Sequence, residues 1–185
     1  MRTRLRFGLV LVCVCFACGA LVGSDENKSA KPTAGLDLSF TAKPAKIAFA
    51  VGEDIVFRFR IKNLSSTRMF VSRYMPVGDF VALKLLGPDG KQVTWQGKIR
   101  SVEYNKDAFL MLEPGKEVSA NHTISTTKGE GFVIDKPGRY TVQAEYSLGP
   151  PEYFGSLAPK ESIPRGTFNS PESHFTVTVP KEAKP

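Results

Sequence analysis

Residues 135–147 constrain the fold of this chain most, because a Pro-Gly turn leads there into a regular alternation of residue types. Every second residue after the turn is apolar, namely Tyr140, Val142, Ala144 and Tyr146. A period of two is typical of an antiparallel strand with one buried face and one solvated face. One strand cannot bury its apolar face alone, so the chain must supply a facing layer.

Residues 55–62 form the most regular alternating run in the chain. Their apolar set is Ile55, Phe57, Phe59 and Ile61, and the other set is Val56, Arg58, Arg60 and Lys62. This pattern predicts a strand at the centre of a sheet. The polar set predicts either an ordinary solvated face or a patch for an acidic partner or a polysaccharide.

Turn residues separate many other short extended segments. Strands are predicted at residues 36–40, 46–50, 68–74, 80–86, 91–96, 108–112, 118–125 and 174–179. The first two are interpreted as one edge strand split at Pro44. Residues 80–86 and 91–96 are interpreted as a hairpin around a Gly-Pro-Asp-Gly turn, with Trp95 in the core. No segment has the apolar period of an amphipathic helix, so the sequence predicts an all-β, immunoglobulin-like antiparallel sandwich of about seven to nine strands.

Residues 1–23 have the three-part pattern of a secretory signal peptide. Three arginines precede the apolar run 7–16, and small residues follow it. The alternative is a short anchor helix that is retained. Residues 24–35 are predicted to be a disordered linker, residues 36–180 the sandwich and residues 181–185 a polar tail. We therefore expect a protein that is secreted, periplasmic or associated with the cell envelope.

All three cysteines, Cys13, Cys15 and Cys18, lie within residues 1–23. The predicted domain has none and must be stable without disulfides. The surroundings of Cys18 are similar to the lipid-attachment box of bacterial lipoproteins, so Cys18 is a candidate lipidation site. Contact with a membrane is expected only through that lipid or through an uncleaved signal.

The charge argues against a nucleic-acid partner. The formal net charge is +7, and residues 1–23 supply three positive charges and no negative one, which leaves +4 for the remainder. Basic and acidic residues are interleaved along that remainder, as on an ordinary solvated surface. We expect a monomer whose partner is a protein or a component of the cell envelope.

The sequence offers no reactive constellation. His122 and His174 lie in predicted strands, without an acidic cluster at ligand spacing, so no metal site, cofactor site or catalytic residue is predicted. No Gly-x-Ser-x-Gly motif occurs, and the protein is predicted not to be an enzyme. Asp135 and Tyr140 flank a Pro-Gly turn as in a tyrosine corner, in which a buried tyrosine hydroxyl bonds to backbone upstream.

Two loops are the candidate binding elements. Residues 148–171 form a long, proline-rich connection that holds Tyr153 and Phe154, and long connections are often functional. The second loop contains Met75 and Pro76. The alternative interpretation is that both aromatic residues of the first loop only cover a sheet edge.

Several stretches resemble known families. Residues 112–117 (Leu-Glu-Pro-Gly-Lys-Glu), 135–144 (Asp-Lys-Pro-Gly-Arg-Tyr-Thr-Val-Gln-Ala) and 170–177 (Ser-Pro-Glu-Ser-His-Phe-Thr-Val) resemble Ig-like domains of secreted bacterial proteins, including the non-catalytic domain of deuterolysin-type metallopeptidases. Residues 80–95 resemble the BsuPI-type proteinase-inhibitor domain. The resemblance implies a sandwich and carries over no catalytic residue, since the His-Glu-x-x-His motif of the metallopeptidases is missing. It adds two alternatives to a non-catalytic binding module: a proteinase inhibitor, or an accessory domain to a secreted hydrolase.

Overall fold

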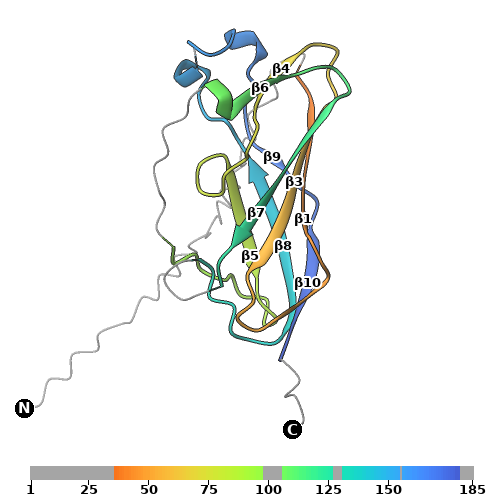
Figure 1. Ribbon diagram of the computed structural model, residues 1–185, viewed down its shortest axis with the longest axis vertical. Helices are drawn as coiled ribbons and strands as arrows, with labels where there is room; N and C mark the ends of the chain where they lie inside the picture. The colour runs from red at the N-terminus through yellow and green to blue at the C-terminus, as the bar shows by residue number, and fades with distance from the viewer. Residues whose placement is uncertain (1–35, 98–105, 127–130, 155, 180–185) are drawn as a thin grey trace, which may run out of the picture.

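The computed structural model describes residues 36–97, 106–126, 131–154 and 156–179 (Figure 1). The predicted signal peptide, the linker, the lipidation candidate Cys18 and the tail lie outside these residues. Among the described residues, no helix has the length and the apolar character needed to cross a membrane.

Two sheets make up the body of the molecule. The first has the order β1-β3-β7 and contains β1 (Leu38–Pro44), β3 (Ile55–Asn63) and β7 (Glu117–Ile124). The second has the order β2-β10-β8-β5 and contains β2 (Ala48–Ala50), β10 (Ser173–Thr178), β8 (Gly138–Tyr146) and β5 (Val81–Leu86), with β9 (Phe168–Asn169) paired to β8. A separate pair, β4 (Met69–Ser72) and β6 (Phe109–Leu112), lies at one end (Figure 1).

The apolar faces of the two sheets form the core. The predicted inward residues of β3 and β8 are all buried. Ring contacts cross from one sheet to the other, with centroids 5.5 Å apart between Phe40 and Tyr146 and 6.1 Å apart between Phe57 and Phe175. The alternating patterns therefore face each other, as a sandwich requires.

The strand order is that of an immunoglobulin-like sandwich. The first, second and fifth strands of that fold share one sheet, and its third, sixth and seventh strands share the other; β1-β3-β7 and β5-β8-β10 reproduce this division. The predicted split first strand is confirmed, because β1 pairs with β3 while β2 joins the second sheet beside β10. The tyrosine corner is confirmed too: the Tyr140 hydroxyl donates a 2.8 Å hydrogen bond to the Lys136 carbonyl.

The predicted strand at residues 91–96 is wrong. The turn after β5 does form, and the Val93 amide donates to the Leu85 carbonyl at 2.8 Å. Pairing then stops, and Trp95 forms an isolated bridge with Phe132 instead. The segment has only Val93 and Trp95 to bury, and both are half-buried, so little apolar area favours further pairing with β5.

Short helical turns are the elements that the sequence pattern did not predict. These are the 3-10 turns η1 (Lys106–Ala108), η2 (Pro151–Phe154) and η3 (Lys160–Ser162). Two of them, with β9, lie in the connection predicted to be irregular. Turns of three or four residues have no apolar period that could reveal them in a sequence.

Candidate functional site: a groove at one end of the sandwich

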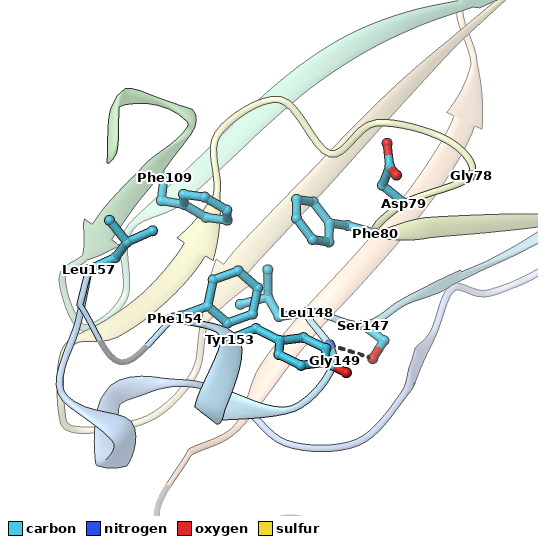
Figure 2. A pocket seen from close by; sticks show the side chains of 10 residues that line it. All are labelled: Gly78, Asp79, Phe80, Phe109, Ser147, Leu148, Gly149, Tyr153, Phe154 and Leu157. Carbon is cyan, nitrogen blue, oxygen red and sulfur yellow. Dashed lines mark hydrogen bonds between the residues drawn. The ribbon is translucent and has the colours of Figure 1, made fainter. Parts of the chain in front are cut away.

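The two predicted binding loops meet at a groove of about 550 Å³ (Figure 2). It lies at the end of the sandwich where β8 finishes and β5 begins. We call it the end groove. Its lining comes from three segments, with Gly78, Asp79 and Phe80 before β5, Phe109 in β6, and Ser147, Leu148, Gly149, Tyr153, Phe154 and Leu157 after β8. A cavity of this size falls within the range of small-ligand and side-chain pockets.

Aromatic rings form the floor of the end groove. Phe154 lies edge-on to Phe109 with centroids 5.3 Å apart, and Phe80 lies 5.7 Å from Phe109 (Figure 2). Phe70 of β4 stacks on Phe109, with ring centroids 4.9 Å apart. Such tilted and offset contacts favour one arrangement of the rings. The floor is therefore a fixed apolar surface.

Backbone hydrogen bonds hold the loop before β5 in place. The Pro76 carbonyl accepts from the amides of Phe80 and Val81, both at 3.1 Å. Met75 has a φ of 46°, a left-handed conformation that is unusual for any residue with a side chain, and its amide donates to the Ser72 hydroxyl at 3.1 Å. These contacts direct Phe80 toward the groove.

Two buried hydrogen bonds fasten the β4–β6 pair, and with it the groove floor, to the sandwich. The Ser72 amide donates to the Tyr146 hydroxyl at 3.0 Å. The Asn63 side-chain amide at the end of β3 donates to the Leu112 carbonyl at 2.8 Å. Both bonds are shielded from water, so losing either one leaves a buried polar group without its partner.

The rim of the end groove is polar and exposed. Tyr153 is 77% exposed and lies at the edge of the groove, next to the buried Phe154 (Figure 2). Asp79 is exposed on the side of β5. The Gly149 amide donates to the Ser147 hydroxyl at 3.2 Å, which closes a tight turn at the rim (Figure 2). An apolar floor inside a polar rim is the usual anatomy of a binding surface.

The four candidate residues have different positions in this arrangement. Tyr153 lines the end groove and is exposed, while Phe154 lines it from beneath and is 6% exposed. The two neighbouring aromatic residues therefore differ, because the turn η2 directs the Phe154 ring into the cluster with Phe109. Met75 is fully buried and Pro76 is half-buried, so they support the groove without lining it. Whether any of the four binds a partner stays a prediction.

The two histidines lie on different sheets. His122 on β7 is half-buried near Phe59, and burial lowers its pKa. His174 on β10 is exposed, and its Nδ1 lies 3.1 Å from the Thr141 hydroxyl. In the described ranges, no three histidine, cysteine or carboxylate side chains come together as metal ligands would.

No family model and no curated protein matches this chain. Similar solved structures include a β-glucosidase of Listeria innocua in complex with isofagomine (TM-score 0.39, 11% identity) and a β-glucosidase of Erythrobacter marinus (TM-score 0.39, 10% identity). For both, the match covers 77% of this chain, which spans 16% of the β-glucosidase. The CARDB domain of the PF1109 protein of Pyrococcus furiosus, in complex with di-metal ions, is also similar (TM-score 0.36, 10% identity, 79% of this chain and 96% of that one). None of these likenesses bears on what the chain does.

Proposed function

We propose that this protein is an exported, non-catalytic binding module that holds a partner protein of the cell envelope at the end groove. The observation that supports this is the fixed aromatic floor beside the exposed ring of Tyr153. An apolar side chain of the partner would fill the groove, and Tyr153 would close over it. Buried aromatic contacts of this kind dominate the energetics of protein interfaces.

No catalytic step is part of the proposal. Among the described residues, the ionisable side chains that line the end groove are Asp79 and Tyr153, and this lining includes no histidine, cysteine or lysine. A hydrolase of the acyl-transfer type would need a nucleophile next to a base. The groove instead offers shape and apolar area, which suit recognition.

A double variant, Tyr153→Ala with Leu157→Ser, tests the proposal. Both residues line the end groove, and neither is fully buried, so the fold should persist. We expect at least one envelope protein to be captured about tenfold less by the immobilised variant than by the wild type, as quantified by mass spectrometry. Phe154→Ala is unsuitable here, because it would remove a core ring.

Ile47→Ala is the matched control. Ile47 is an apolar residue that is 83% exposed, and it follows β1 at the opposite end of the sandwich. This variant should capture the same proteins as the wild type. If the double variant also captures them unchanged, the end groove is not the binding site.

The proteinase-inhibitor alternative has less support. An inhibitor presents an exposed, extended loop to the protease, whereas the loop of Tyr153 contains the helical turn η2 and Met75 of the other loop is fully buried. An inhibition assay against serine proteases and metalloproteases tests the proteinase-inhibitor hypothesis. If micromolar protein slows none of them, the inhibitor hypothesis is to be dropped. The remaining alternative, an accessory domain to a secreted hydrolase, requires a hydrolase among the captured proteins.

A further inference from the structure

The outer face of the β1-β3-β7 sheet concentrates positive charge. Lys43 of β1 and Arg58, Arg60 and Lys62 of β3 are all exposed on this face. They line a shallow depression of about 300 Å³ across the strands. We call these four residues the basic face.

The register places two of these cations directly opposite each other. Lys43 pairs with Arg58 across β1 and β3, and like charges in such positions destabilise a sheet. Arg58, Arg60 and Lys62 follow at every second residue of β3, about 6.6 Å apart along the strand. The stability of the sheet does not favour this arrangement of like charges, which suggests that an anion binds here.

Acidic residues compensate little of this charge. Glu117 is the only carboxylate that lines the depression in the described part of the chain, and its oxygen lies 3.6 Å from an Arg60 nitrogen. Both side chains of this pair are about half exposed, at 48% and 47%, so water weakens their attraction. Glu117 also lies opposite Lys62 across β3 and β7, so Lys43 and Arg58 are the two cations of the basic face without a carboxylate partner among the described lining residues.

Besides Glu117, the residues that pair with the basic face from β1 and β7 carry hydroxyl groups or an amide. Ser39 and Thr41 pair with Lys62 and Arg60 from β1, and Ser119 and Asn121 pair with Arg60 and Arg58 from β7. The aromatic residues of β1 and β3 point into the core instead, namely Phe40, Phe57 and Phe59. Val56, half-buried at the start of β3, is the one apolar side chain that the described part of β3 places on this face, which otherwise offers cations and hydrogen-bonding groups.

We propose that the basic face binds a linear acidic polysaccharide. The planar guanidinium groups of Arg58 and Arg60 suit carboxylate or sulfate groups, to which arginine donates paired hydrogen bonds. The neighbouring hydroxyls and the Asn121 amide suit the sugar hydroxyls. The row of cations along β3 suits a chain whose charges repeat along its length.

Other polyanions fit this surface less well. Proteins use interfaces with an apolar, aromatic-rich centre, which the basic face lacks. Single-stranded nucleic acids stack their bases on aromatic side chains, and none lies here among the described residues. A membrane-binding surface combines cations with apolar residues that enter the lipid, and none of the described lining residues of the depression is apolar.

The test is binding of the purified protein to heparin and to polygalacturonate, measured by titration calorimetry at low and at physiological salt. Neutral dextran is the uncharged comparison. The variant Arg58→Gln with Arg60→Gln removes two charges from the basic face, and both side chains are exposed, so it should fold normally. We expect both acidic polymers to bind, salt to weaken the binding, and the variant to bind at least tenfold more weakly.

A second double variant, Lys84→Gln with Arg139→Gln, removes the same charge from exposed positions of the other sheet. It should change the affinity less than twofold. If both double variants lose the same affinity, the binding depends only on the net charge of the protein, and the proposal is overturned. Tighter binding to duplex DNA or to vesicles with anionic lipid, or no binding to either polysaccharide at low salt, would also overturn it.

Discussion

At the scale of single residues, two tyrosine hydroxyls fix how β8 joins the rest of the molecule. Tyr140 donates to the turn before the strand, and Tyr146 accepts from the Ser72 amide of β4. Burial raises the pKa of both tyrosines, so each stays neutral and hydrogen-bonded when the chain is folded. Both hydroxyls therefore act in the fold, at the two ends of one strand.

Tyr146→Phe should lower the free energy of unfolding by about 1–3 kcal/mol, because it leaves the buried Ser72 amide without an acceptor. Urea unfolding monitored by circular dichroism measures the change. Tyr74→Phe, at a residue that is 58% exposed, should have almost no effect. Equal stability of the wild type and the Tyr146 variant would mean that another group satisfies the amide.

His122 should make the stability depend on pH below neutrality. Burial lowers its pKa below the ordinary 6.5, so the unfolded chain takes up this proton at a higher pH than the folded chain. The free energy of unfolding should therefore be unaffected by His122 above pH 6.5 and fall as the pH drops toward the lower folded-state pKa.

The urea midpoint of the wild type, measured between about pH 7.5 and pH 5, should fall more steeply than that of His122→Gln. The slope of the wild type has to be compared with that of His122→Gln, because carboxylates in both proteins also begin to titrate at the acid end of this pH range. Identical slopes for the wild type and His122→Gln would contradict the assignment.

At the scale of elements, the turn before β8 determines how that strand enters the sheet. Gly138 opens β8 with a φ of 138°, a region that disfavours other residues. A Cβ atom there would lie 2.7 Å from two side-chain carbons of Pro88, in the turn after β5. Backbone conformation and close packing of two turns both require glycine at this position.

Gly138→Ala should therefore destabilise the protein by about 1–3 kcal/mol, or more where the Pro88 clash adds to the backbone strain. Gly115→Ala is the matched control, because Gly115 has a φ of 71° but no atom within 4 Å of an added Cβ. We expect Gly115→Ala to lower the free energy of unfolding by about 1–2 kcal/mol through backbone strain alone. Thermal and urea unfolding should rank the two variants in that order, and the opposite order would refute the contact with Pro88.

At the scale of the whole molecule, the sandwich has one apolar core and no disulfide in its described residues. Its inward faces, the β4–β6 pair and the floor of the end groove belong to one continuous cluster of buried side chains. The single Trp95 packs against that cluster from outside the sheets, with its ring 5.1 Å from Phe132. The fluorescence of Trp95 therefore reports on the packing at the periphery of the core.

We predict one cooperative unfolding transition. Tryptophan fluorescence and far-ultraviolet circular dichroism should give the same midpoint in urea, because the segment of Trp95 is bonded to β5 and packs on the shared core. A reducing agent should leave that midpoint unchanged, since the described domain contains no cysteine. An earlier fluorescence transition would show instead that the segment around Trp95 unfolds by itself.

The sequence alone determined the class of fold and much of its detail. Alternation with a period of two identified β3 and β8 and their buried faces, because that pattern depends only on neighbouring residues and on one side of the strand being dry. The Pro-Gly turn before Tyr140 predicted the tyrosine corner for the same reason, since the hydroxyl bonds to backbone only four residues away.

Only the tertiary structure decided the candidate site. The sequence named both loops of the end groove, but nothing local showed that Phe154 turns inward onto Phe109 while Tyr153 stays exposed. The basic face likewise needed the register that sets Lys43 opposite Arg58. These features depend on contacts between segments far apart in the chain, and such contacts are set by how the whole core packs, which a local pattern does not contain.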